Sequence, residues 1–246
     1  MRRLAAWLLA GLTVFAAAHP AATAMTVSEK RQEAQIGRLK KALIDSNRRS
    51  EYAKSELIAR EILSLAESTY GANSAEAAEA LTLVAGTLQT QSKQAKMEPL
   101  LKRALEIRER AAEPNKAEIA KAMSNLAGLY AFQGDFNRAE ALYRKALEIR
   151  EINLGLNHVL VASALAELAS IELTMGRPAD AEPLLKRALV IWEVASGSDA
   201  PMLLPILSKY AQVLHDVGDT RNAHQIEARI ERIRKKRDAD LRDALH

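Results

Sequence analysis

The sequence has no cysteine and few aromatic residues. Cysteine is missing from all 246 positions, and phenylalanine, tryptophan and tyrosine together account for 4%. Without thiols the chain has no disulfides, no thiolate metal ligands and no cysteine nucleophile. Because alanine and leucine dominate the apolar residues, the composition favours helices in close contact through small side chains and disfavours a β-sheet.

Neither sign of charge is in large excess. The chain carries 35 lysines and arginines against 31 aspartates and glutamates, for a formal net charge of +4. An excess this thin does not suggest a nucleic-acid-binding surface, so no nucleic-acid partner is expected. The basic run at 232–237 is interpreted as a solvated helix face, because acidic residues are interleaved with it.

Long apolar runs are absent beyond the first 24 residues. Residues 1–24 combine Arg2 and Arg3, an apolar run over 4–18 and a small-x-small end at Ala22, Thr23 and Ala24. This order is typical of a secretory signal peptide, and the apolar run is shorter than the roughly 20 residues of a membrane span. We expect cleavage near Ala24 and a periplasmic or secreted protein with no stable membrane insertion; an uncleaved anchor is the alternative.

The chain also contains an internal repeat of 42 residues. The octapeptide at 98–105 recurs letter for letter at 182–189, and a looser copy at 139–147 lies halfway between them. Copies at a fixed step predict a helical unit that stacks on its neighbours, and not one globular core. The predicted organisation is a signal peptide at 1–24, N-terminal capping helices or a degenerate repeat at 25–72, a repeat array at 73–233 with units near 73–114, 115–156, 157–198 and 199–233, and a polar helix end at 234–246.

Each unit is predicted to contain two helices with one apolar stripe each, since apolar residues recur every three or four positions. A turn at Gln133, Gly134 and Asp135 separates the two helices of the second unit. Glycine there can adopt a left-handed backbone, and Asp can cap the following helix. A further column before the first helices predicts four N-caps, at Asn73, Asn115, Asn157 and Asp199.

These columns resemble the tetratricopeptide repeat (TPR), in the 42-residue form found in kinesin light chains. The resemblance is carried by Asn125-Leu126-Ala127-x-Leu129-Tyr130, by the Gly134 turn, by the motif that begins at Ala139, and by Leu154-Gly155-x-Asn157-His158. It implies an all-α fold, a right-handed superhelix (α-solenoid) of about five helix pairs with helical caps. It also implies that first helices line the concave side.

Two positions depart from this pattern. Glu172 stands where the second unit has Tyr130, and Glu227 stands where it has Tyr143. A buried unpaired carboxylate would cost several kcal/mol. We therefore expect Glu172 to lie half exposed at the groove edge and to reach solvent or a partner, and Glu227 to lie on the solvated side of a closing helix.

Catalytic and metal-binding signatures are scarce. The sequence has no nucleotide-binding loop and no His-Glu-x-x-His motif. His215 and His224 lie on different predicted helices, and with Asp216 they are a sparse set for a metal, which needs three or more converging ligands. No enzyme activity, metal or cofactor is expected, with an enzyme or metal site at His215 and His224 as a minor alternative.

The resemblance predicts which residues face a partner in the concave groove. Asn125 is the strongest candidate, because an amide can both donate to and accept from the main chain of an extended peptide. The predicted partner-binding residues are Lys121, Ser124, Asn125, Gly128, Phe132, Glu167, Ser170, Lys209 and Gln212, with Thr82, Gly86 and Gln89 in the first unit. Glu167 places a negative charge where family members that hold acidic chain ends have a positive one, so capture of acidic C-termini is not expected.

The resulting hypothesis is an exported, non-enzymatic interaction module that holds a peptide segment or a protein face in its groove, as a scaffold or assembly factor. Backbone hydrogen bonds and a few buried side chains would supply the affinity. The alternative from another class is a structural repeat protein whose self-association is its function; the sequence leaves its oligomeric state open.

Overall fold

The structure is a computed structural model that describes residues 26–89 and 93–243. The predicted signal peptide and its cleavage site lie outside the described residues. Within these two ranges every element is a helix, which confirms the all-α prediction.

Ten α-helices of the described chain form five consecutive hairpin-like pairs, as predicted. The pairs are α1 (Val27–Arg48) with α2 (Tyr52–Tyr70), α3 (Ala75–Gln89) with α4 (Met97–Arg110), α5 (Lys116–Phe132) with α6 (Phe136–Leu154), α7 (Val159–Thr174) with α8 (Pro178–Ser196), and α9 (Leu204–Asp216) with α10 (Thr220–Asp243). Short 3-10 helices, η1 (Gln94–Lys96) and η2 (Pro201–Leu203), precede α4 and α9.

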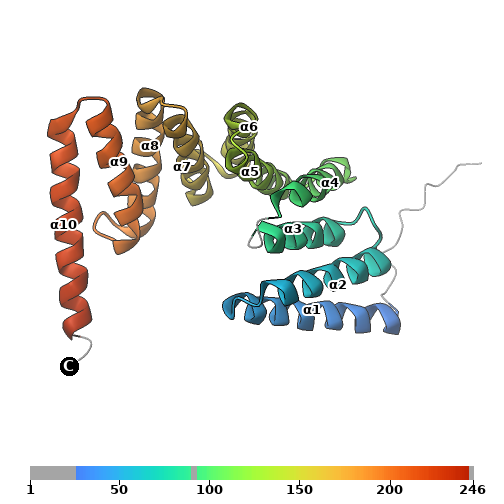
Figure 1. The fold of residues 1–246 in the computed structure, drawn as a ribbon. Helices are drawn as coiled ribbons and strands as arrows, with labels where there is room; N and C mark the ends of the chain where they lie inside the picture. The colour runs from blue at the N-terminus through green and yellow to red at the C-terminus, as the bar shows by residue number, and fades with distance from the viewer. Residues whose placement is uncertain (1–25, 90–92, 244–246) are drawn as a thin grey trace, which may run out of the picture.

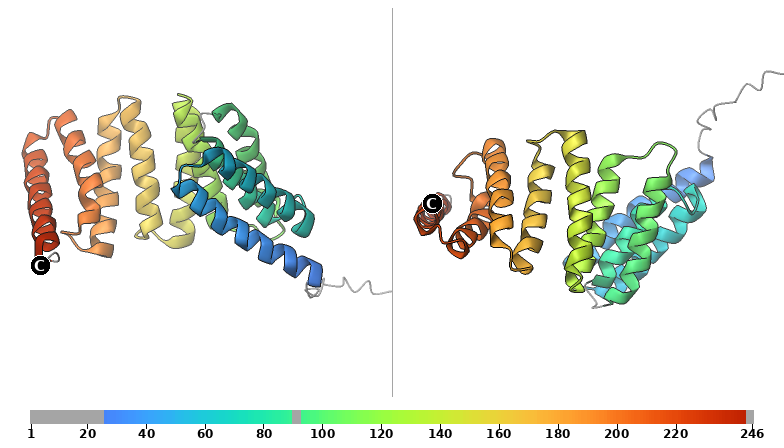
Figure 2. Two further views of the ribbon diagram at one scale, coloured as in Figure 1. Left: turned by 60° about the horizontal axis from the view of Figure 1, so that its bottom comes forward. Right: turned by 90° about the horizontal axis from the view of Figure 1, so that it is seen from above.

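The pairs stack in chain order into a right-handed superhelix that has the outline of an arch, with α1 and α10 at its two ends (Figure 1). The turned views in Figure 2 show the same side-by-side order of the helices from one end to the other. Each helix contacts its pair partner and the neighbouring pair, so the core is a continuous layer between helices and has no single centre.

Small residues at the helix crossings build this core. Ala127, Ala139 and Ala146 are fully buried, and Leu126 is buried beside them. Leu147 is partly buried against the same layer. The low aromatic content therefore has a structural counterpart, since alanine lets neighbouring helix backbones approach closely.

The turn inside each later pair has the predicted geometry. Gly134, Gly176 and Gly218 all have positive φ, a backbone region that side chains disfavour. Asp135 accepts a hydrogen bond from the backbone N–H of Arg138 and caps α6. At the N-terminal end, Thr26 and Glu29 form a complete capping box on α1.

The predicted column of N-caps is correct only at Asn115, whose Oδ1 accepts from the backbone N–H groups of Ala117 and Glu118. The cap of α3 is Ser74 instead of Asn73, and the cap of α7 is His158 instead of Asn157. Asp199 pairs with Arg232 and caps no helix.

A glycine turn causes this shift. After α2, α6 and α8 the chain passes through a glycine of positive φ, and the residue three positions later donates to that glycine's carbonyl (Gly71, Gly155 and Gly197). The turn places the start of the following helix one residue later than in the second unit. In the second unit the glycine column holds Glu113, and the preceding helix α4 ends early, at Arg110.

An arginine clamp joins successive pairs at three of the junctions. Arg103 pairs with Glu67 at 2.8 Å and donates to the carbonyl of Ala72 at 2.9 Å. Each clamp joins a second-helix arginine, the second-helix glutamate of the preceding pair and a carbonyl of the loop between them. The other two are Arg187 with Glu151 and Leu156, and Arg229 with Glu193 and Ser198.

The junction between α4 and α6 lacks this clamp. Lys145 occupies the arginine column and Glu109 the glutamate column, and no ion pair joins them in the described chain. Helix α4 has 14 residues, whereas α2, α6 and α8 have 19 each. The middle of the arch therefore has one junction that is built differently from its neighbours.

The expectation for Glu172 is wrong. Its side chain is 0% exposed and does not reach solvent. Arg144 approaches one carboxylate oxygen at 2.8 Å, and Arg177 approaches the other at 2.6 Å. Both arginines also contact Glu140, at 2.8 and 2.6 Å, so two carboxylates and two guanidinium groups form one network.

Arg177 explains how a buried glutamate is tolerated there. It stands 42 residues after Asp135, in the column where the second unit has its capping aspartate, and α8 has no side-chain cap. The third unit has therefore exchanged a cap for a counter-charge to Glu172. Glu227, in contrast, is exposed as expected, and its carboxylate lies 3.0 Å from Nε2 of His215.

A candidate partner-binding groove

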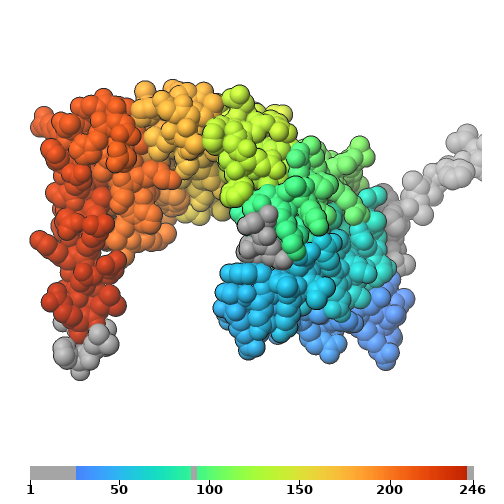
Figure 3. All heavy atoms as spheres, viewed as in Figure 1, coloured from blue at the N-terminus to red at the C-terminus, as the bar shows by residue number. Residues whose placement is uncertain are grey.

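The inner side of the arch is hollowed, and the space-filling view shows the opening beneath the central helices (Figure 3). A pocket of about 250 Å³ lies on the α3 and α5 side of this hollow, above the start of α4. Four of the predicted site residues from α5 come together in it: Ser124, Asn125, Gly128 and Phe132. Thr82, Gly86 and Gln89 line the opposite wall from α3, as predicted for the first unit.

Asn125 and Phe132 are two lining residues with capacity left for a partner. The side-chain amide of Asn125 is half-buried and makes no hydrogen bond within the part of the chain that the structure describes. Phe132, at the end of α5, is 65% exposed. An unsatisfied amide beside an exposed aromatic ring offers both a main-chain contact and an apolar anchor.

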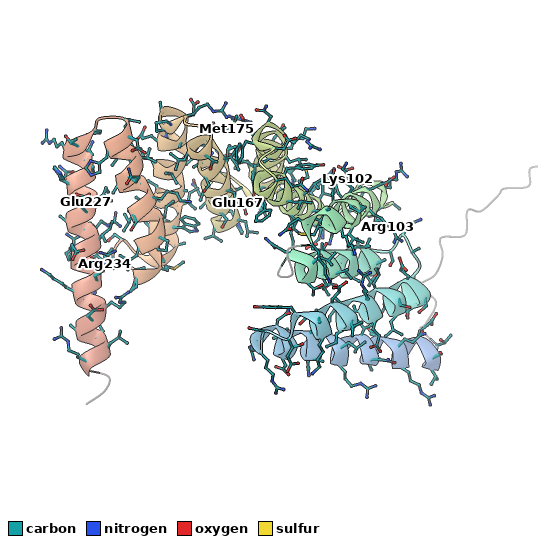
Figure 4. All side chains as sticks on the ribbon, viewed as in Figure 1. Lys102, Arg103, Glu167, Met175, Glu227 and Arg234 are labelled. Atoms are coloured by element: carbon teal, nitrogen blue, oxygen red, sulfur yellow. The ribbon has the colours of Figure 1, made fainter. Side chains whose placement is uncertain are left out.

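Ser124 and Glu167 are tied to each other by Arg150. The guanidinium of Arg150, from α6, donates to Oγ of Ser124 at 3.1 Å and lies 3.5 Å from Glu167. The hydroxyl of Ser124 in turn donates to Glu167 at 3.2 Å. Glu167 projects from α7 on the inner side of the arch (Figure 4). Both residues therefore brace the groove, and their polar groups are already occupied.

The same arrangement occurs 42 residues earlier in a looser form. Arg108, from α4, is buried and lies 3.5 Å from Oγ1 of Thr82 and 3.4 Å from Glu118. Burial lowers the pKa of the Arg108 guanidinium, while the nearby Glu118 opposes that effect. The charged groups that flank the pocket are thus held in pairs outside it.

The remaining predicted residues lie elsewhere. Lys121 lines a separate recess with Arg108 and Glu118, towards the start of α5. Lys209 donates to Oγ of Ser170 at 2.7 Å, which links α9 to α7. Gln212 bonds to Asp216 and lines a shallow recess at the α9–α10 end. The nine residues therefore do not line a single pocket.

His215 and His224 meet at this far end. Their rings lie 5.7 Å apart in an edge-to-face arrangement. No group of three or more metal-ligating side chains occurs among the described residues. The contact between the two rings and the bond from His215 to Glu227 account for both histidines as packing on α10.

Several lining residues were not predicted from the sequence. Met97, Leu101 and Leu129 form a buried apolar floor, and Gln94 lies at the rim. In the repeat pattern Met97 and Leu101 belong to a second helix and should pack only inward. The sequence signal is a change of residue type in a regular register, because Met97 stands in the column of Ala139 and Leu101 in the column of Tyr143.

The tetratricopeptide repeat family model matches residues 85–152 and 160–236. The chain belongs to the tetratricopeptide repeat family. The match runs from the last turn of α3 into α10, apart from residues 153–159, and leaves out α1 and α2. TPR proteins of this kind are protein-interaction scaffolds.

Solved TPR structures share this fold. The nearly identical TPR-like repeats of a Podosopora anserina protein, assigned as a kinesin light chain, have a TM-score of 0.69 and 15% identity, covering 86% of this chain and 98% of that one. RapI in its apo form has a TM-score of 0.68 at 19% identity, covering 83% and 72%. PilF of Pseudomonas aeruginosa has a TM-score of 0.61 at 15% identity, covering 82% of this chain and 77% of that one. At these identities the likeness concerns the fold alone.

No curated protein gives a significant sequence match. Across residues 26–89 and 93–243, no helix is both long and apolar enough to span a bilayer.

Proposed function

We propose that this TPR protein is an exported, non-enzymatic scaffold or assembly factor that holds a segment or face of a protein partner on its concave side. The observation that carries the proposal is the pocket between α3 and α5, where the amide of Asn125 has no partner within the described chain and Phe132 stays exposed. These groups suit a polypeptide, which presents main-chain donors and acceptors together with apolar side chains.

The size of the pocket supports a macromolecular partner over a small substrate. Small-molecule sites usually enclose roughly 300–1,000 Å³, and this pocket encloses about 250 Å³. It therefore suits one side chain of a larger partner. No lining residue of the described chain combines a nucleophile with a base, so the groove is proposed to bind without catalysis and without a cofactor.

The decisive experiment compares partner capture by matched variants. The double variant Asn125→Ala with Phe132→Ala removes the unpaired amide and the exposed ring. It should abolish recovery of the wild-type partner from the cell envelope of the source organism. Lys121→Ala is the control, because Lys121 lies in a different recess. Quantitative mass spectrometry would measure recovery, and circular dichroism would verify folding. Equal recovery by the double variant and the wild type would show that the partner binds elsewhere.

Export is proposed from the signal-like residues 1–24, which combine two arginines, an apolar run and a small-x-small end. N-terminal sequencing of protein from the periplasmic or extracellular fraction should find a start close to Met25. A protein recovered only from the cytoplasm with Met1 intact would contradict export.

A further inference from the structure

Gly86 is a glycine in the interior of α3 that no packing constraint explains. It is exposed, and a Cβ placed on it would meet no neighbouring atom of residues 26–89 and 93–243 within 4 Å. Its φ is not in the left-handed region. Because glycine inside a helix is destabilising relative to alanine, the position carries a cost that the fold does not require.

Gly128, which occupies the same column in the next pair, differs in this respect. A Cβ there would lie 3.4 Å from the hydroxyl of Tyr143 on α6, at the near limit of ordinary van der Waals contact. Burial raises the pKa of Tyr143 to about 12, and its phenol stays neutral beneath Gly128. Leu101 holds the Tyr143 column in the preceding pair, and it leaves open space over Gly86.

The pocket that Gly86 borders has a distinctive chemistry. Among its described lining residues none is charged. Its floor is apolar, made by Met97, Leu101 and Leu129, with Phe132 as an exposed wall. Asn125 and Gly86 line the pocket from two different helices, α5 and α3.

We infer that Gly86 is where the main chain of an extended partner segment approaches α3, and that this segment is uncharged and inserts one apolar side chain between Phe132 and the α4 floor. The inference rests on the proposed function of the concave face and specifies its ligand. Asn125 would bond the main chain of the segment opposite Gly86, as an amide can donate and accept at once.

A charged segment would find no counter-charge in this pocket. Arg108 and Arg150, whose guanidinium groups contact lining residues of the pocket, are already paired with Glu118 and Glu167. Burying a carboxylate or an ammonium group there would incur an uncompensated desolvation cost. An apolar side chain flanked by peptide groups would match the wall, the floor and the free amide together.

The test uses the full chain and a displayed library of random peptides with fixed linkers at both ends, so that no chain terminus is free. Selected peptides would be synthesised, and their Kd measured by fluorescence anisotropy. Gly86→Gln fills the open space with a good helix former that the fourth unit carries naturally in this column, at Gln212. Gly37→Gln is the matched control, because Gly37 is also exposed and open but lies on α1.

The expected result is a set of peptides with an apolar residue in an uncharged stretch, whose Kd rises at least ~tenfold in Gly86→Gln and stays unchanged in Gly37→Gln. Both variants should have a Tm equal to or above that of the wild type.

Peptides that depend on a charged residue, peptides insensitive to Gly86→Gln, or a library with no enriched sequence would each overturn the inference. If enriched peptides bind Gly86→Gln normally but fail to bind Asn125→Ala, the concave site stands and only its proposed chemistry is wrong. If neither change matters, the proposed function fails as well.

Discussion

Two neighbouring junctions of the arch are built in different ways. Between α6 and α8 the Arg187 clamp, the Gly155 turn and the buried Glu172 network all hold successive pairs together. Between α4 and α6 the clamp column holds Lys145 and the turn column holds Glu113. In the columns that hold Glu172 and Glu140 at the other junction, the Tyr130 hydroxyl donates a hydrogen bond to Glu98 at 3.1 Å.

The pocket lies at the second, less constrained junction. Its residues come from α3, the start of α4 and α5, on the two sides of that junction. A repeat protein gains stability from nearest-neighbour interfaces, so the junction with fewer ion pairs should be the less stable of the two. The proposed binding pocket lies at that junction.

The largest effect is expected from breaking the tight junction at Glu172. Glu172→Ala leaves Arg144 and Arg177 without one of their two carboxylate partners and opens a buried space. Both arginines are partly exposed and keep Glu140, so the loss corresponds to hydrogen bonds to a charged group. The free energy of unfolding, measured in urea, should fall by about 1.5–3 kcal/mol.

Two controls sharpen this result. Glu227→Ala, in an exposed position of a second helix, should change stability by less than about 0.5 kcal/mol. Glu172→Leu should recover much of the loss, because an apolar residue of similar size often replaces a buried pair at little cost. A Glu172→Ala protein as stable as the wild type would show that the network does not hold the junction.

Exchanging the clamp residues tests the comparison in both directions. Arg187→Lys removes the forked contact to Glu151 and the Leu156 carbonyl, and should cost about 1 kcal/mol. The reverse pair, Lys145→Arg with Glu113→Gly, should stabilise the α4–α6 junction by a few tenths of a kcal/mol to about 1 kcal/mol. Hydrogen exchange followed by mass spectrometry would report both changes locally. If both substitutions left exchange in the flanking helices unaltered, the clamp would have no part in holding the pairs.

The smallest expected effect is on the pH dependence of the free energy of unfolding. A hydrogen bond from Arg177, helped by Arg144, lowers the pKa of Glu140 below its ordinary value of 4.5. A carboxyl whose pKa is lowered by folding adds stability above the unfolded value, and that stability is lost as the pH falls through the folded value.

Glu140→Gln should therefore be less stable than the wild type at neutral pH, and the difference should narrow below pH 4.5. Urea unfolding at both pH values measures it. The corresponding Glu98→Gln change would probe the α4–α6 junction, because Lys102 and Tyr130 lower the pKa of Glu98. A difference for Glu140→Gln that is constant with pH would show that its ionisation does not stabilise the fold.

Much of the architecture was predictable because it is local or periodic. The 42-residue step, the paired helices, the Gly134 turn and the Asp135 cap all depend on residues close in the chain. The resemblance to the TPR family predicted Asn125, Gly128 and Phe132 on the concave side, and the structure places all three in one pocket. The N-cap column failed at three of four positions because a glycine turn shifts the helix start by one residue.

The partners of Glu172 were harder to find, since Arg144 lies 28 residues away. The sequence did contain one signal. In the third unit Arg177 replaces the aspartate found at Asp135, and Glu172 replaces the tyrosine found at Tyr130. Ser124 and Glu167, 43 residues apart, were both predicted to face a partner. Nothing local shows that Arg150 reaches between them.

The residue order alone settles the helical class, the pairing and the length of the stack, because propensity, capping and apolar spacing act within a few turns of chain. Which side chains remain free, and where the stack opens into a pocket, is decided only when three helices meet. A buried charge or an open recess depends on groups that the chain brings together from dozens of residues apart.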